Sequence, residues 1–185
     1  QSTFKVLSKI KSGIIHGETG LIDEKSNGNG SVMRVLPLCY VLINEPIDIK
    51  YKMIEEVSGI THAHIRSKIA CSIYVEIGIQ LLLGNAPFTA YENMKNEIVP
   101  YYKSRGVEVE LKHFKRILEQ DISTLQLSEI ESSGYVVDSL EASLWCFLTT
   151  TNYEEAVLRA IRLGLDTDTI GAMTGGLAGL YYGER

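Results

Sequence analysis

The sequence lacks any long apolar run. None of its 185 residues belongs to a stretch near the roughly 20 apolar residues that a helix needs to cross a bilayer. The N-terminal segment also lacks the basic-then-apolar pattern of a secretory signal. We therefore expect a cytoplasmic protein that does not bind a membrane.

An excess of positive charge is missing as well. The chain has 18 basic and 23 acidic residues, which gives a net charge of −5. A cationic surface is what usually holds nucleic acid, so we expect no nucleic-acid partner. A polyanionic ligand would have to be held by backbone N–H groups, a metal ion or a few well-placed cations.

Cysteine is scarce and odd in number. Cys39, Cys71 and Cys146 each lie in an apolar stretch, which predicts buried free thiols in a reducing compartment. No Ser-His-Asp, Cys-His or zinc-ligand pattern occurs at a recognisable spacing. Neither a serine or cysteine nucleophile nor a zinc site is therefore indicated.

Helical periodicity is what the chain does have. With 45% hydrophobic residues it can build one core, so residues 1–185 are expected to form a single, all-α domain of orthogonally packed helices. Pro37 should kink the apolar run that contains it, and residues 85–134 should form short helices and loops. The longer helices are expected over residues 4–15, 61–83, 136–148, 153–163 (capped by Asn152) and 169–182.

The last of these helices has glycine at every fourth position. Gly171, Gly175 and Gly179 share one face. Each glycine costs about 1 kcal/mol in a helix interior relative to alanine. Three on one face therefore predict a neighbouring helix packed very close.

The strongest site signal precedes this helix. Asp166 and Asp168 are two residues apart in a turn, and Thr169 adds a hydroxyl. Alternate side chains of a loop can converge on one point, and oxygen-only ligands suit Mg²⁺ or Mn²⁺. The alternative is an ordinary helix N-terminus, where Asp and Thr are favoured as caps.

A glycine-rich loop is the second signal. It contains Asn27, Gly28, Asn29 and Gly30, and its backbone N–H groups could hold phosphate. An ordinary Asn/Gly turn explains the same residues. Arg34, just beyond it, could contact phosphate or pair with a carboxylate.

Two aromatic residues complete the candidates. His62 opens the long helix, and a lone histidine there is more often structural than a ligand. His64 would face another way, so the two are not expected to share a metal. Tyr135 follows Gly134 and could stack on a ligand or simply pack at a helix start.

Taken in order, four segments resemble one family, the ADP-ribosylglycohydrolases. The resemblance covers roughly residues 13–183. It is carried by Ser26–Gly30 with Met33, Arg34 and Pro37; by Thr61-His62; by Gly134-Tyr135-Val136 with Trp145; and by Gly164–Gly183 with Asp166-Thr167-Asp168-Thr169 and Gly175-Gly176-Leu177-Ala178-Gly179.

The resemblance implies a compact all-α fold and a hydrolase that removes ADP-ribose from proteins or from small derivatives by metal-assisted cleavage at C1″. Asp166, Asp168 and Thr169 would be ligands of a two-metal Mg²⁺ or Mn²⁺ site, the two aspartates acting in catalysis. The substrate, ADP-ribose or an ADP-ribosylated protein, would contact Asn27, Gly28, Asn29, Gly30, His62 and Tyr135.

One family element is absent from the chain. Members have a Thr-Asp-Asp-Thr segment upstream of everything present here, and it supplies the other metal ligands. We therefore expect an N-terminally truncated, incomplete domain that self-associates or is complemented by an N-terminal chain. A non-catalytic ADP-ribose-binding or structural protein and a generic helical interaction domain are the alternatives.

Overall fold

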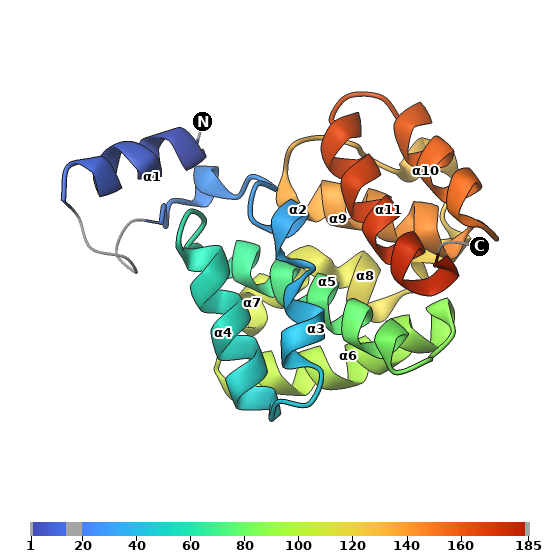
Figure 1. Ribbon diagram of the computed structural model, residues 1–185, viewed down its shortest axis with the longest axis horizontal. Coiled ribbons are helices and arrows are strands. Elements are labelled where there is room, and N and C mark those ends of the chain that lie inside the picture. The colour runs from blue at the N-terminus through green and yellow to red at the C-terminus, as the bar shows by residue number, and fades with distance from the viewer. Residues whose placement is uncertain (1, 14–19, 184–185) are drawn as a thin grey trace.

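The computed structural model describes residues 2–13 and 20–183 as a helical body with α1 at one side of it (Figure 1). Within these residues there is no sheet, only two isolated β-bridges, so the all-α expectation is confirmed. The α- and 3₁₀-helices (η) are α1 (Ser2–Lys11), η1 (Glu24–Ser26), α2 (Val32–Val35), α3 (Leu38–Leu42), α4 (Ile47–Gly59), α5 (Ile65–Leu82), α6 (Pro87–Ser104), α7 (Glu108–Leu111), η2 (Lys112–Phe114), α8 (Lys115–Glu119), η3 (Ile122–Thr124), η4 (Leu127–Glu129), α9 (Val136–Leu148), α10 (Tyr153–Arg162) and α11 (Thr167–Tyr182).

Helix α5 runs through the centre of the body. It is mostly apolar, as a helix surrounded by others is expected to be, and nearly all of its residues are buried. It packs against α2, α3, α4, α6, α9 and α11. None of the helices that the structure describes combines the length and apolar character needed to span a bilayer.

Several predicted helices shift at their ends. The long helix begins at Ile65 and not at residue 61, because His64 is its N-cap and accepts a hydrogen bond from the Arg66 N–H (3.2 Å). The predicted break at Pro37 is confirmed, since α2 ends before it and α3 begins directly after it. Helix α1 ends at Lys11 and residues 12 and 13 form a turn, so the predicted continuation is wrong there, and residues 14 and 15 lie outside the described residues.

The prediction of short, interrupted elements over residues 85–134 is wrong in its first third. Pro87–Ser104 is one continuous helix although Pro100 lies within it. Its face toward the core includes Tyr91 and Tyr102, which are fully buried. Packing of this face outweighs the hydrogen bond that proline removes.

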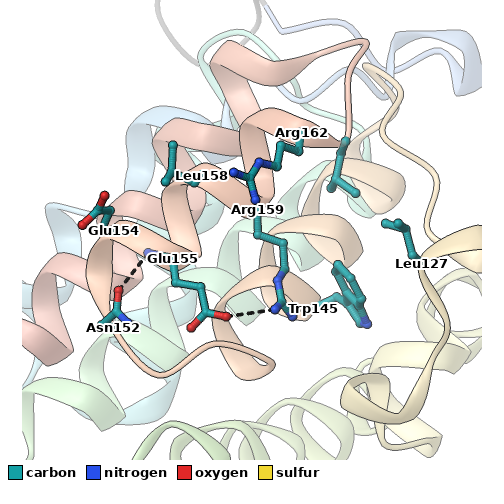
Figure 2. A pocket seen from close by; sticks show the side chains of 9 residues that line it. Leu127, Trp145, Asn152, Glu154, Glu155, Leu158, Arg159 and Arg162 are labelled. Carbon is teal, nitrogen blue, oxygen red and sulfur yellow. Dashed lines mark hydrogen bonds and ion pairs between the residues drawn. The ribbon is translucent and has the colours of Figure 1, made fainter.

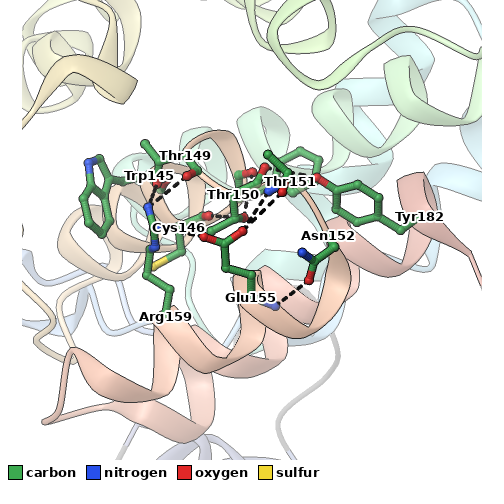
Figure 3. A network of polar contacts seen from close by, with 10 residues as sticks. Trp145, Cys146, Thr149, Thr150, Thr151, Asn152, Glu155, Arg159 and Tyr182 are labelled. Atoms are coloured by element: carbon green, nitrogen blue, oxygen red, sulfur yellow. Dashed lines mark hydrogen bonds and ion pairs between the residues drawn. The ribbon is translucent and has the colours of Figure 1, made fainter.

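The close neighbour predicted from the glycine stripe of α11 is α10. A Cβ added at Gly171 would lie 3.8 Å from Ile161, and one at Gly175 would lie 3.4 Å from Val157. Helix α10 begins at Tyr153, and Asn152 is its N-cap as predicted, because the Asn152 side chain accepts a hydrogen bond from the Glu155 N–H (2.9 Å). The Glu155 carboxylate in turn accepts from the preceding Thr151 N–H (Figure 3).

The three cysteines are buried free thiols. Burial raises the pKa of Cys39 to about 11 and that of Cys146 to about 12, and it also raises the pKa of Cys71. A raised pKa suppresses the thiolate, so these residues pack and do not react.

Candidate functional site

The glycine-rich loop is attached to the start of α9. Gly28 and Tyr135 form an isolated antiparallel bridge. The Asn29 N–H donates to the Gly134 carbonyl (3.2 Å), and the Val136 N–H donates to the Asn27 carbonyl (3.0 Å). Two of the predicted site segments, more than 100 residues apart in sequence, therefore lie side by side.

Asn29 joins this pair to the third segment. Its side-chain N–H₂ donates to the Asp166 carboxylate and to the Ser139 hydroxyl (2.7 Å). Asn29 and Asp166 are 137 residues apart, so this contact depends on the whole fold. The glycine-rich loop and the first predicted metal ligand consequently share one site.

Asp166 is the N-cap residue of α11, yet its side chain does not cap the helix. One carboxylate oxygen faces Asn29, and the other accepts a hydrogen bond from the Thr169 hydroxyl (3.3 Å). Its backbone N–H donates to the Ser132 carbonyl (3.2 Å). The simple cap interpretation therefore does not explain this aspartate, although it is compatible with the helix start.

The turn before Asp166 has an unusual backbone. Gly164 has φ +81° and Leu165 has φ +55°. Within the described part of the chain, Leu165 is the single residue other than glycine with a positive φ. Such a conformation persists only where its surroundings enforce it. The strained turn therefore fixes the direction in which the Asp166 side chain points.

Asp168 lies in a different setting. Helix α11 begins at Thr167, two residues earlier than predicted, so Asp168 is in the first helical turn and not in a loop. Its side chain is exposed and makes no hydrogen bond or ion pair with any residue that the structure describes. The structure brings Asp166 and Thr169 together, but it leaves Asp168 beside them without a direct contact.

His62 lies behind the glycine-rich loop. It is 2% exposed, and a Cβ added at Gly30 would lie 3.0 Å from its Cε1 atom. Burial, reinforced by the nearby charge of Arg34, lowers the pKa of His62 to about 4. The imidazole is therefore neutral at physiological pH.

The hydrogen bonds around His62 favour one tautomer. Arg34 donates to the Thr61 hydroxyl (2.6 Å), which lies 2.8 Å from His62 Nδ1. With Arg34 as donor, the hydroxyl hydrogen remains for Nδ1, so the ring proton belongs on Nε2. Nε2 is the ring nitrogen nearer Gly28 and Gly30, which places an N–H donor beside the loop.

Arg34 forms no ion pair with a carboxylate among the described residues, so that alternative is wrong. Besides Thr61, it donates to the Gly30 carbonyl and so braces the glycine-rich loop. Burial lowers its pKa. The cation thus supports the geometry of the loop and of His62 at once.

Some N–H groups of the loop remain available. Those of Gly28 and Gly30, which are partly exposed, donate to no acceptor among residues 2–13 and 20–183. Backbone N–H groups that point away from the protein are suitable donors for an anionic oxygen. The loop therefore retains the means to hold a phosphate group.

A small pocket of about 290 Å³ opens beside this loop. Asn27 is held in its wall by two bonds: its N–H₂ donates to the Glu24 carbonyl (2.9 Å), and its side-chain oxygen accepts from the Ser67 hydroxyl (3.0 Å). The pocket is lined by Glu24, Lys25, Asn27, Gly28, Gly134 and Tyr135.

Arg66 supports the same pocket from below the surface. It is 4% exposed, donates to Glu110 (2.9 Å) and Glu24 (3.2 Å), and its guanidinium carbon lies 6.0 Å from the centre of the Tyr135 ring. Burial raises the pKa of Tyr135. The ring is therefore a neutral, partly exposed wall of the pocket.

The oxygen donors match Mg²⁺ or Mn²⁺ in kind but are few in number. Carboxylate and hydroxyl oxygens are the ligands that these hard cations accept. In the part of the chain that the structure describes, however, no three acidic, histidine or cysteine side chains gather where they could hold an ion. Asp166, Asp168 and Thr169 therefore provide at most part of a metal site.

Several participants carry no recognisable sequence signal. Ser139 and Ser132 hold Asn29 and Asp166, and Arg66 and Glu24 frame the pocket. Ser139 follows Tyr135 by one helical turn, which is the one spacing that could have indicated it. The others reach the site only through tertiary contacts.

Known proteins resemble this chain over most of its length. The sequence profile of the family described as ADP-ribosylglycohydrolase matches residues 1–185. The ADP-ribosylarginine hydrolase Tri1 of Serratia proteamaculans (strain 568) is 29% identical over 170 residues, covering 91% of this chain and 43% of that protein. The ADP-ribosyl-[dinitrogen reductase] glycohydrolase of Rhodospirillum rubrum is 27% identical over 165 residues, covering 89% and 49%.

A solved structure is also similar. An "ADP-ribosylglycohydrolase-related protein complex" superposes with a TM-score of 0.79 at 27% identity, covering 98% of this chain and 58% of that one. The chain spans less than half the length of the two hydrolases named above. On its sequence, its fold and the order of its site segments, the chain belongs to the ADP-ribosylglycohydrolase family.

Proposed function

We propose that this chain carries part of the active site of a hydrolase that removes ADP-ribose from ADP-ribosylated proteins or small ADP-ribose derivatives. The bond cleaved would be the glycosidic bond at C1″. Family membership supports the reaction class. The printed names of two relatives, one acting on ADP-ribosylarginine and one on dinitrogen reductase, support a modified protein as substrate.

The observation that carries the proposal is the contact between Asn29 and Asp166. It joins the loop suited to phosphate to the carboxylate suited to catalysis. His62 and Tyr135 border the same loop from two other segments. A generic helical domain whose glycines and aspartates served only as turns and caps would have no reason to bring these four segments together.

The placement of the ligand follows from the available donors. The diphosphate would accept from the free N–H groups of Gly28 and Gly30, with Asn27 and Asn29 holding the loop. Neutral His62 would donate from Nε2 to a ribose hydroxyl on the adenosine side. Tyr135 would form one wall of the nucleotide pocket.

For the metal, Asp166, Asp168 and Thr169 would contribute oxygen ligands to Mg²⁺ or Mn²⁺. A bound divalent ion would supply electrostatic stabilisation and orient ribose hydroxyls as an oxocarbenium-like transition state forms. The remaining ligands would come from outside this chain, through self-association or a complementing N-terminal chain. We place the protein in the cytoplasm because its three thiols are all unpaired.

The second candidate function is ADP-ribose binding without hydrolysis. The shortage of metal ligands among the described residues favours it for the isolated chain. The two functions share the nucleotide site and differ only in turnover.

The test measures ADP-ribose release from an ADP-ribosylated protein, with and without Mg²⁺ or Mn²⁺, alongside calorimetric binding of ADP-ribose. Metal-dependent release establishes the hydrolase, whereas binding without release establishes the second candidate. Asp168→Ala is expected to abolish metal-dependent release while changing the free energy of unfolding by less than about 0.5 kcal/mol, because the side chain is exposed and unpaired. Unchanged turnover in this variant would remove Asp168 from the metal site.

A further inference from the structure

A second and larger cavity lies on α10, apart from the nucleotide pocket. Its volume is about 670 Å³, within the range of small-molecule sites. One wall is α10, where Leu158 and Arg159 lie four and three residues before Arg162, so each is one helical turn from that arginine. Leu127 of η4 stands opposite, with Trp145 of α9 between them in Figure 2.

The apolar part of this cavity is accessible. Leu127 is 62% exposed and Leu158 is 41% exposed, whereas Trp145 is largely buried, at 7%. The Trp145 ring is held in place by its Nε1–H, which donates to the Leu125 carbonyl (3.0 Å). An apolar ligand would therefore meet a prearranged aromatic and aliphatic surface.

Arg159 belongs to the wall and is fully engaged. It donates to the Thr149 carbonyl (2.9 Å) and hydroxyl (2.7 Å), and it pairs with Glu155 (3.0 Å) (Figure 3). Its guanidinium carbon lies 5.4 Å from the centre of the Trp145 ring. This arginine shapes the cavity but has little left to offer a ligand.

Arg162 differs from Arg159 in this respect. It lines the same cavity, yet it makes no hydrogen bond or ion pair with any part of the chain that the structure describes. A guanidinium has five N–H donors in a planar fork that matches a carboxylate. It is thus a recognition group without a partner, one helical turn from the exposed Leu158.

The charges around the cavity limit the ligand to a single negative charge. Two arginines, Arg159 and Arg162, and two glutamates, Glu154 and Glu155, line the cavity, and all four belong to α10. Glu155 is neutralised by Arg159, so Arg162 offers one positive charge and Glu154 repels a second negative one. A diphosphate would be disfavoured here, whereas a monocarboxylate meets one free cation.

We propose that the cavity between α9, α10 and η4 is a second ligand site that binds a small apolar monocarboxylate. The carboxylate pairs with Arg162, and the apolar portion packs against Trp145, Leu127 and Leu158. The site is separate from the glycine-rich loop and does not depend on the proposed hydrolase function.

Trp145 makes the test direct, since it is the one tryptophan in the chain and it lines this cavity. The probe is octanoate, compared with 1-octanol and octylammonium, which have the same chain and a different head group. We expect octanoate to change the Trp145 fluorescence saturably, and 1-octanol and octylammonium to change it much less. Equal responses to all three, or no response to octanoate, would overturn the proposal.

Variants then test the contacts. Arg162→Gln should raise the dissociation constant for octanoate about five- to tenfold, the usual range for losing one charge-assisted hydrogen-bonded pair, and Leu158→Gln should also weaken binding. Lys103→Gln, on an exposed part of α6, is the matched charge control and should have no effect. Octanoate binding that is equal in Arg162→Gln and the parent would refute recognition by Arg162.

Competition separates the two sites. Saturating ADP-ribose should leave the octanoate titration unchanged, and displacement would show that the cavity is not a separate site. A failure of the hydrolase proposal would appear elsewhere, as absence of ADP-ribose binding or release, with the octanoate titration intact.

Discussion

At the scale of single residues, Asn29 is the side chain on which the candidate site depends. Asn29→Asp keeps its size but replaces the donor that faces Asp166 with a second carboxylate. We expect this change to lower the free energy of unfolding by about 1 to 3 kcal/mol, because a hydrogen bond to a charged group is lost and like charges meet. ADP-ribose affinity should fall as well, since the loop is released from α11. Chemical denaturation and calorimetry measure the two effects.

The control for Asn29 is Asn96→Asp, the same change at an exposed position of α6. It should alter stability by less than about 0.5 kcal/mol. Equal effects in the two variants would mean that the contact between Asn29 and Asp166 contributes nothing.

His62 gives the second prediction at this scale. Its pKa is about 4 in the folded protein, below the ordinary value of 6.5. Between these values the unfolded chain binds more protons, so the stabilisation from neutral His62 is complete above pH 6.5 and is lost as pH falls toward 4. An NMR titration should find His62 uncharged at pH 5.5. A midpoint of His62 near 6.5 would contradict the buried, neutral donor.

At the scale of helices, the contact between α11 and its neighbours predicts opposite effects at two glycines. A Cβ at Gly176 would lie 2.6 Å from Leu36 and 2.9 Å from the Tyr74 hydroxyl, which donates to the Met173 carbonyl. One at Gly179 would meet nothing nearer than 3.8 Å. Gly176→Ala should therefore destabilise by about 1 to 2 kcal/mol, and Gly179→Ala should stabilise by up to about 1 kcal/mol through helix propensity.

Thermal unfolding of both variants tests the pair. If the two variants changed the unfolding temperature in the same direction, close packing would not be the reason for glycine at position 176. Each variant is the control for the other, because both exchange glycine for alanine in one helix.

The helices also show which parts of the fold a local sequence pattern can predict. The apolar spacing and the cap at Asn152 predicted α9 and α10 correctly, because these signals act within one or two turns. The expectation of short helices and loops over residues 85–134 is wrong for α6, since buried tyrosines stabilise that helix through distant packing. The start of α11 was placed two residues late because Asp166, and not a later residue, occupies the cap position.

The candidate site was predictable as a set of motifs but not as an arrangement. Asn29, Asp166 and Tyr135 each stood out by local chemistry. Their contacts, and the support from Ser139 and Arg66, come from segments that only the fold brings together. Likewise, nothing in the spacing of the two aspartates indicated that Asp166 would face Asn29 while Asp168 faces solvent.

At the scale of the whole molecule, Glu141 should shape the dependence of stability on pH. Burial raises its pKa from 4.5 to about 7, although Arg116 lies 3.1 Å away. Arg116 is the more exposed partner, at 36% against 8% for the Glu141 side chain, so solvent screens its charge and burial prevails. Glu141 is thus largely protonated in the folded protein below neutral pH.

The sign of the effect is opposite to that of most carboxylates. Between pH 4.5 and 7 the folded state binds more protons than the unfolded one, so the stabilisation is complete below pH 4.5 and is lost as pH rises through 7. Glu141→Gln, which stays neutral, should remove this loss, which is on the order of 1 to 3 kcal/mol. Denaturation of both proteins from pH 5 to 8 measures the difference between their profiles, with exposed Glu154→Gln as the control. Parallel profiles for parent and Glu141→Gln would mean that Arg116 keeps this carboxylate ionised in the fold.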